Sequence, residues 1–388
     1  MKQYFKQFLT RKYVFGGIGL YVISTLLSFF VFSMVQGPLA GTPSSPLPKD
    51  VDGNLAFDES LPKTEKCPLT SQLFSKQKRE WWEQHRPLGV MIENHEEARP
   101  QSGLSSADIV YEAVAEGGIT RFMAIFYCQD AGVVGPVRSA RTYFIDFISG
   151  YGDKPLYVHV GGANVAGPAN ALGQLSDYGW VGRNDINQFS VGFPTFWRDY
   201  ERLGRTVATE HTMYSTAEKL WKVAQDRELT NVDEDGVAWD EGFTPWQFKE
   251  DAKEVERGAA SPSFGFWEGY SAFEVKWNYD KVTNSYKRDN GGKPHVDKDN
   301  DKQIEVKNIV VVFTTERSLN DEEKHMLYGT KGQGKTLLFF DGNVVEGTWE
   351  KKDRESSMIL KDKSGKLVTL TAGQIWVEIL PIGTEVTH

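Results

Sequence analysis

Two glutamates and an arginine near the middle of the first half of the chain have the types and spacing for acid–base chemistry. Glu112 and Glu116 precede a Gly-Gly pair at positions 117–118, and Arg121 follows it. This pattern predicts a β-hairpin with a two-residue turn, in which Val114 lies opposite Arg121 and both glutamates share its face. Paired carboxylates can act as acid and base in glycoside hydrolysis. The alternative without a function is an exposed ion cluster. The neighbouring arginine also lowers the pKa of a carboxyl group, which is the wrong direction for a general acid at neutral pH.

Two histidines could assist such a reaction. His159 lies in a predicted buried strand at 156–160, and His211 follows Glu210. A lone histidine in a buried strand is more often a satisfied core residue than a catalyst. The pair lacks the His-x-x-x-His or Glu-x-x-His spacing that supports a metal site. We therefore expect no metal and no other cofactor, and the catalytic candidates are Glu112, Glu116, His159 and His211.

A second set of residues could bind an anion. Arg138 and Arg141 stand at the start of a predicted helix, 142–148, where the positive end of the helix dipole gives two cations no support. They hold either the hairpin carboxylates or a ligand carboxylate or phosphate. Gly161 and Gly162 follow the strand at 156–160 and precede a helix-compatible stretch, an order that can cradle an anion. The candidates from this pattern are Arg121, Arg138, Arg141, Gly161 and Gly162.

One nucleotide-binding pattern is rejected on its context. The segment from Gly329 to Thr336 satisfies G-x-x-x-x-G-K-[ST] letter for letter. A phosphate-binding loop needs a strand before it and a helix after it. Here a predicted helix at 321–327 comes first and a predicted strand at 337–340 follows. We therefore expect a glycine-rich turn and no bound nucleotide.

The N-terminus predicts a membrane anchor. Residues 13–35 form an uncharged run of 23 residues, enough to cross the hydrocarbon core as a helix. Lysines and arginines precede this run, and none follows until Lys49, so the N-terminus is expected in the cytoplasm and the rest outside. A cleaved signal peptide is the alternative. Residues 1–35 are thus the cytoplasmic tip and anchor, and the proline-rich residues 36–66 form a tether.

Composition and charge describe the part beyond the tether. Hydrophobic residues make up 40% of the chain and charged residues 25%, which is typical of globular domains. The net charge of −9 argues against nucleic-acid binding, which needs a basic surface. Outside the cytosol Cys67 and Cys128 can form a disulfide; two buried free thiols are the alternative.

The pattern of apolar residues predicts two domains. Short apolar runs alternate with helical stretches over residues 67–226, which favours an α/β domain. An acidic connecting segment covers residues 227–262. Residues 263–388 read as a mostly β domain, with alternating strands and turn dipeptides such as Asp341-Gly342.

Several motifs resemble one known family. Residues 91–94 (Met-Ile-Glu-Asn), 98–103 (Ala-Arg-Pro-Gln-Ser-Gly), 112–122, 135–141, 159–162 and 196–199 are similar to the YerB-like family, a domain-of-unknown-function family whose members are described as bacterial lipoproteins. Residues 279–297, 308–311 and 373–376 resemble its separate C-terminal domain. The resemblance implies an envelope protein with no established activity. It adds Glu93, Asn94, Arg99, Ser139 and Arg198 to the candidate ligand-binding residues.

The chain departs from the family pattern at its anchor and near two candidate residues. A predicted spanning helix stands where relatives have a lipid-modified cysteine, Ala163 stands where a serine is expected, and the neighbours of His211 differ. The favoured hypothesis is a binding protein for an anionic cell-envelope polymer or an envelope protein. The alternatives are an envelope hydrolase or transferase that uses Glu112 or Glu116 with His159 or His211, and an assembly role.

Overall fold

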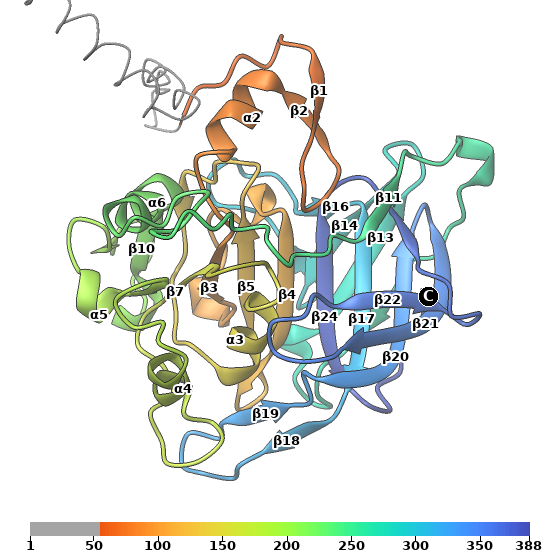
Figure 1. The fold of residues 1–388 in the computed structure, drawn as a ribbon. Coiled ribbons are helices and arrows are strands. Elements are labelled where there is room, and N and C mark those ends of the chain that lie inside the picture. The colour runs from red at the N-terminus through yellow and green to blue at the C-terminus, as the bar shows by residue number, and fades with distance from the viewer. Residues whose placement is uncertain (1–54) are drawn as a thin grey trace, which may run out of the picture. The chain divides into compact units, whose positions relative to one another are not determined.

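A mixed sheet of ten strands forms the spine of the protein in a computed structural model, which describes residues 55–388 (Figure 1). Five strands come from residues 88–187 and five from residues 308–381. In spatial order the strands are β22 (Ile359–Asp362), β21 (Asn343–Lys351), β20 (Gly332–Phe340), β17 (Asn308–Thr314), β24 (Ile375–Pro381), β4 (Ile109–Glu116), β5 (Ile119–Phe126), β3 (Leu88–Glu93), β7 (Leu156–His159) and β8 (Asp185–Asn187).

The two halves of this sheet meet between β24 and β4. These strands run parallel, with Ile375 opposite Ile109 and Glu378 opposite Glu112. On its other side β24 pairs in parallel with β17. Parallel strands are buried on both faces, which explains the unbroken apolar run at 309–313. The sheet therefore continues from one predicted domain into the other, and the described residues fall within one compact unit.

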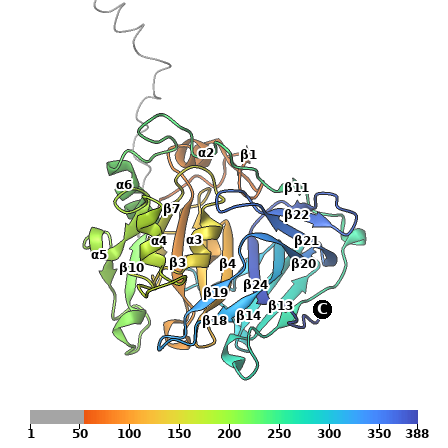
Figure 2. The same cartoon turned by 60° about the horizontal axis from the view of Figure 1, so that its bottom comes forward.

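Different layers cover the two faces of the central strands. Helix α3 (Thr142–Ile148) lies against β4 and β5 (Figure 2), where Phe147 stacks on Tyr111 with 5.1 Å between ring centroids. A five-stranded sheet covers the opposite face, and its Trp277 packs 5.5 Å from Trp376 of β24. Its strands are β12 (Ser263–Phe264), β13 (Val275–Asp280), β14 (Ser285–Asn290), β15 (Lys293–Pro294) and β16 (Glu305–Val306).

The remaining elements are short. Paired strands outside the two larger sheets are β1 (Lys63–Lys66) with β2 (Leu73–Ser75), β10 (Met213–Thr216) with β6 (Val133–Val134) and β9 (Trp197–Arg198), β11 (Gln247–Lys249) with β23 (Thr369–Thr371), and β18 (Glu316–Ser318) with β19 (Met326–Tyr328). The other α-helices are α2 (Lys76–Trp82), α4 (Ala171–Asp177), α5 (Gln188–Val191) and α6 (Ala217–Asp226). Single 3₁₀ turns are η1 (Glu96–Ala98), η2 (Leu104–Ser106), η3 (Thr209–His211), η4 (Glu254–Glu256) and η5 (Ser271–Phe273).

We call residues 67–226 the first segment and residues 263–388 the second segment. The protein is mostly β, and its described α-helices all lie in the first segment. The predicted α/β alternation occurs as β3, α3, β7, α4 and β8, whose strands run parallel to one another. The predicted helix at 321–327 is wrong, because this stretch turns into β19. Residues 332–336 belong to β20, so a strand takes up the second half of the rejected nucleotide pattern. Among residues 55–388 no helix is long and apolar enough to span a membrane; the predicted anchor at 13–35 lies outside the described residues.

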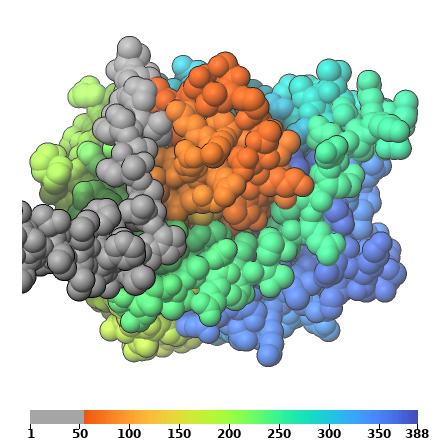
Figure 3. Space-filling model, turned by 45° about the horizontal axis from the view of Figure 1, so that its top comes forward, coloured from red at the N-terminus to blue at the C-terminus, as the bar shows by residue number. Residues whose placement is uncertain are grey.

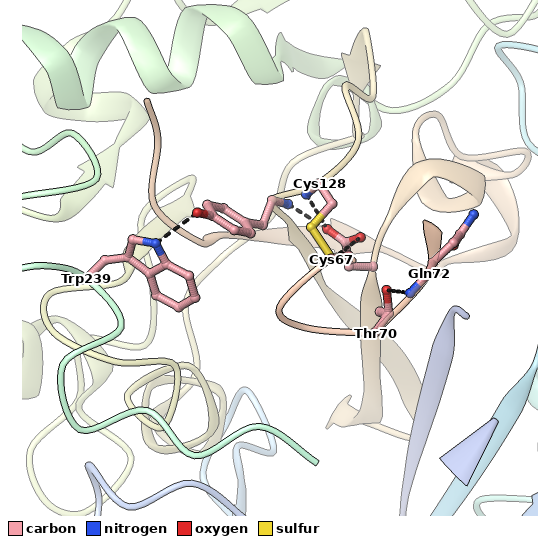
Figure 4. Close-up of a disulfide and its surroundings, with 7 residues drawn as sticks. Cys67, Thr70, Gln72, Cys128 and Trp239 are labelled. Atoms are coloured by element: carbon pink, nitrogen blue, oxygen red, sulfur yellow. Dashed lines mark hydrogen bonds between the residues drawn. A yellow bond between two sulfur atoms is a disulfide. The ribbon is translucent and has the colours of Figure 1, made fainter. Parts of the chain in front are cut away.

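A disulfide attaches the N-terminal hairpin to the main sheet (Figure 4). Cys67 and Cys128 are buried and joined, with 5.9 Å between their Cα atoms. The carboxyl group of Asp108 lies beside them and accepts hydrogen bonds from the backbone N–H groups of Tyr127 and Cys128 at 2.7 and 2.9 Å. Burial raises the pKa of Asp108 to about 7, although these two hydrogen bonds oppose the shift.

The segment that connects the two family regions runs across the surface. It passes from α6 to β11 beside the β1–β2 hairpin (Figures 1 and 3). The indole N–H of Trp239 donates to the hydroxyl of Tyr127 at 2.9 Å, and that of Trp246 donates to the carbonyl of Met358 at 2.7 Å. These contacts fix the segment to both halves of the sheet.

Candidate functional site

A β-bulge in the hairpin of β4 and β5 separates the two candidate carboxylates. Glu116 pairs with Ile119 as the two-residue turn requires, but beyond the bulge Ala113 lies opposite Arg121. The predicted pairing of Val114 with Arg121 is therefore wrong by one residue. Because side chains alternate between faces, one inserted residue reverses the face of everything before it. Glu112 and Glu116 consequently lie on opposite faces of the sheet, which overturns their pairing as acid and base.

Glu116 lies on the α3 face and binds two arginines. One of its carboxylate oxygens accepts a hydrogen bond from Arg121 at 2.8 Å, and the other forms an ion pair with Arg141. Burial alone would raise the pKa of Glu116, but the two guanidinium charges outweigh burial and hold the pKa at about 2. A carboxyl group with this pKa is ionised at neutral pH, so Glu116 is not a general acid.

Glu93 extends the same cluster at the end of β3. It lies opposite Arg121 in the sheet, forms an ion pair with Arg138 and is 3.5 Å from Nδ1 of His211. Burial would raise its pKa, but contacts with His211, Arg121 and Arg138 lower it. The arginine cluster, by which we mean Glu93, Glu116, Arg121, Arg138 and Arg141, therefore pairs each of its three guanidinium groups with one of two carboxylates. These five side chains together keep one positive charge. Of the two outcomes left open by the sequence, this is the internal network.

Glu112 lies on the other face, in a network that joins the two segments. Its carboxylate accepts hydrogen bonds from Thr120 at 2.7 Å and from Asn94 at 3.2 Å. It also forms an ion pair with Arg288, from the second segment, and both side chains have no solvent exposure. A substrate has no access to such a carboxylate. Glu112 is a structural anion here.

His159 is a core residue in the structure. Its Nε2 lies 2.5 Å from a carboxylate oxygen of Asp185, and its Nδ1 lies 2.6 Å from the carbonyl oxygen of Gly161. Both ring nitrogens are engaged, and the side chain is fully buried. His159 thus holds the turn that follows β7 and has no nitrogen left for a substrate.

The predicted glycine cradle does not form. The N–H of Gly161 donates to the side chain of Asn187 at 3.2 Å, and its carbonyl accepts from Ala140 at 3.0 Å. Helix α4 begins only at Ala171, so its N-terminus does not follow Gly162 directly. The N–H and carbonyl groups of Gly161 are therefore used within the protein.

The other candidates have scaffold contacts. Arg198 donates to Oγ1 of Thr212 at 3.3 Å and supports the turn that carries His211. Ser139 contributes its carbonyl, which accepts from Arg121 at 3.3 Å. Asn94 is buried and connects Glu112 to Arg99, whose Nε donates to Oδ1 of Asn94 at 3.0 Å. Of the whole predicted set, Arg99 is the residue that reaches an open cleft.

A cleft of about 300 Å³ lies where the two segments meet. We call it the basic cleft, because three cations and one carboxylate line it together with polar and small residues: Arg99, Arg205, Lys293 and Glu96, then Pro100, Asn290, Gly291, Pro294, His295 and Val296. Its walls are the turn around η1 and the β14–β15 hairpin. Sequence reasoning missed Arg205 and Lys293, since they belong to no local motif and meet Arg99 only through the fold.

The three cations of the basic cleft differ in their burial and in the hydrogen bonds that hold them. The guanidinium of Arg99 donates to the carbonyls of Asn94 at 2.9 Å and Ala272 at 2.8 Å, and burial followed by the charge of Arg288 lowers its pKa to about 10. It stays charged at neutral pH. Arg205 and Lys293 are exposed, and Arg205 donates to the carbonyls of Glu97 at 2.9 Å and Arg99 at 3.1 Å. Guanidinium and ammonium groups together can bind the oxygens of a phosphate or carboxylate.

Comparison with known proteins agrees with this architecture. Residues 71–230 match the N-terminal domain of the DUF3048 family, described as a protein of unknown function, and residues 266–377 match its C-terminal domain. A Bacillus subtilis protein described as "Putative lipoprotein YerB" is 33% identical over 322 residues, which cover 81% of this chain and 86% of the relative. The crystal structure of YerB from Bacillus subtilis is similar with a TM-score of 0.68 and 28% identity, over 84% of this chain and all of that one. The chain therefore belongs to the DUF3048 family, the family of YerB.

Proposed function

We propose that this protein binds an anionic component of the cell envelope outside the cytosol, in the basic cleft. The observation that carries the proposal is the charge of that cleft, where Arg99, Arg205 and Lys293 face a single carboxylate, Glu96. Ligand sites occur preferentially in concave regions at the junction of two segments. A cleft with an excess of one charge concentrates ligands of the opposite charge. A phosphate- or carboxylate-bearing polymer fits this chemistry.

The location rests on the N-terminus and the disulfide. Residues 13–35 are uncharged and are preceded by Lys2, Lys6, Arg11 and Lys12, so we propose a single-pass anchor with a cytoplasmic N-terminus. The Cys67–Cys128 bond is typical of an oxidising compartment. The description of the Bacillus subtilis relative as a lipoprotein agrees with attachment at the outer face of the membrane.

The arginine cluster is connected to one wall of the basic cleft through Glu93 and the residue that follows it. Glu93 pairs with Arg138, and the next residue, Asn94, accepts hydrogen bonds from Arg99 through both its carbonyl and its side chain. Gln101 donates to the carbonyl of Glu93 at 2.9 Å and so holds the other end of the same turn. The family-like motifs at 91–94 and 98–103 therefore shape one wall of the cleft. This gives the motifs a structural role that needs no catalytic residue.

The test is a binding titration with the full chain in detergent micelles. Polyphosphate and polyglutamate serve as defined probes, and pelleted cell-wall material serves as the natural one. The double variant Arg205→Gln/Lys293→Gln removes two exposed cations from the cleft. We expect its affinity for the preferred polyanion to fall about ten-fold or more, since each charge-assisted contact contributes roughly 1 kcal/mol.

The control variant removes the same charge elsewhere. Lys352→Gln/Lys366→Gln replaces two exposed lysines outside the cleft and is expected to bind like the unaltered chain. Equal binding by both double variants would overturn the cleft as the site. Release of soluble fragments from the cell-wall material would show that the protein does more than bind.

A further inference from the structure

Two histidines and a glutamate meet on the surface beside the basic cleft. His95, Glu97 and His211 each have a possible ligand atom within 4.8 Å of the others. The rings of His95 and His211 stack, with 4.8 Å between centroids and 13° between planes. His95 and Glu97 flank the start of η1, and His211 ends η3, more than one hundred residues later. No helix spacing in the sequence shows this combination.

His211 is a buried imidazole without a close partner. Its Nδ1 is buried and lies 3.5 Å from an oxygen of Glu93, and its Nε2 lies 3.7 Å from an oxygen of Glu97. Both contacts are longer than a good hydrogen bond. Within the described residues neither ring nitrogen of His211 is taken up by a short hydrogen bond, and Nε2 is the nitrogen that lies toward Glu97.

The other two ligands can move to complete the site. The side chain of Glu97 is 53% exposed, and His95 is half-buried. A single hydrogen bond of 3.2 Å, from the backbone N–H of Glu97, holds the Nδ1 of His95. Ligand atoms around one zinc ion stand roughly 3.3 Å apart, because each bond is about 2.0–2.1 Å long. Side-chain rotations that shorten the separations between ligand atoms by up to about 1.5 Å would therefore close the ligand set.

The surrounding charges balance. Arg138 is neutralised by Glu93, and Arg205 donates to the backbone carbonyl of Glu97 at 2.9 Å. Glu96 and Glu210 add negative charge beside the two histidines. A divalent cation would meet two imidazole nitrogens and one carboxylate. This ligand set suits zinc and related transition metals better than magnesium or calcium, which prefer oxygen alone.

We infer that His95, Glu97 and His211 bind one divalent transition-metal ion of the zinc type. The site lies next to the basic cleft, since Glu96, which lines the cleft, stands between His95 and Glu97 in the chain. The inference is independent of the proposed anion binding, because it rests on other side chains. Cys67 and Cys128 do not compete for the ion, since they are joined in a disulfide.

The experiment is a competition titration of the full chain in detergent micelles with zinc and a chromogenic chelator. We expect one zinc ion per chain, and a fall in affinity of at least ten-fold in Glu97→Gln and His95→Ala. Glu385→Gln and His388→Ala are the matched controls, as each removes the same type of side chain at an exposed position outside the ligand set and the basic cleft. Far- and near-ultraviolet circular dichroism checks that every variant is folded.

Two results would overturn the inference. The first is no zinc bound above the level of a His95→Ala/Glu97→Gln double variant. The second is zinc binding that the ligand variants and the control variants weaken equally. Retained polyanion binding in Glu97→Gln would separate the metal site from the basic cleft.

Discussion

Glu378 and Arg288 show how single residues keep the interior of the protein electrically balanced. Glu378 lies opposite Glu112 in the sheet, and the indole N–H of Trp277 donates to its carboxyl group at 3.1 Å. Burial, and next the charge of Glu112, raise the pKa of Glu378 well above its usual range. The buried guanidinium of Arg288 thus pairs with the carboxylate of Glu112, and the carboxyl group of Glu378 keeps its proton.

This arrangement predicts unequal costs for two substitutions. Glu378→Gln replaces a neutral acid with a neutral amide of similar shape, and we expect the free energy of unfolding to change by less than about 1 kcal/mol. Arg288→Met leaves the carboxylate of Glu112 buried without a counter-ion, and we expect a loss of about 3–5 kcal/mol. Urea unfolding measures both, and equal losses would contradict the proton on Glu378.

Asp108 predicts a pH dependence of stability. Its pKa is about 7 in the folded protein, against an ordinary value of 3.8, so the unfolded chain releases the proton first as the pH rises. The stability from this group is complete below about pH 4 and is lost as the pH rises through about 7. Asp108→Asn keeps an acceptor for the two N–H groups. We expect this variant to gain stability over the unaltered chain by up to about 4 kcal/mol from about pH 4 to about pH 8. A difference that does not vary with pH would contradict this prediction.

At the scale of elements, the hairpin of β4 and β5 shows what sequence can and cannot predict. The glycine pair at 117–118 correctly predicts the turn, because both glycines have the positive φ that such a turn needs. The bulge next to it is set by packing on both faces of the sheet, and no residue type marks it. A one-residue shift was enough to assign Glu112 to the wrong face.

The same limit applies to the candidate sites. The motifs around Glu93, Arg121 and Arg138 do come together, because β3 and β5 are neighbouring strands and the loop that carries Arg138 bridges to β3. Arg205 and Lys293 meet across the two segments, and a single sequence holds no signal for a contact of that length. Strand order in a sheet is decided by long-range pairing, so it is the part of a fold that local patterns predict least.

The hairpin turn offers a matched pair of substitutions. A Cβ atom on Gly118 would lie 2.3 Å from the ring of Tyr270, whereas one on Gly117 would meet nothing within 4 Å. Both positions have positive φ, so Gly117→Ala is expected to cost about 1 kcal/mol in free energy of unfolding. Gly118→Ala is expected to cost roughly 1–3 kcal/mol more. Thermal unfolding followed by circular dichroism measures the difference, and equal costs would show that Tyr270 does not pack on the turn.

At the scale of the whole molecule, the two family segments behave as one folding unit. The β24–β4 pairing, the Glu112–Arg288 ion pair and the Phe122–Trp376 ring contact all join residues from the two segments. Separating the segments would expose an unpaired strand edge and leave buried charges without partners. Two family domains along the sequence are therefore built on one hydrophobic core.

This predicts a single cooperative unfolding transition for the full chain. Differential scanning calorimetry in detergent should show one peak whose calorimetric and van't Hoff enthalpies agree. A chain that stops after residue 262 lacks β17 and β24, and it should show no cooperative transition. Two separate peaks for the full chain, or a sharp transition for the shortened one, would contradict the shared core.

The parallel pairing of β24 with β4 also has a consequence in time. Ile109 must wait for Ile375, its neighbour in the sheet, which is synthesised 266 residues later (375 − 109). At ribosomal speeds of about 5–20 residues per second, this delay is roughly 13 to 50 s. Throughout that interval one edge of β4 is open to any other extended strand. Until β24 has been synthesised, the nascent chain therefore needs a chaperone that covers this edge, or translocation across the membrane in an unfolded state.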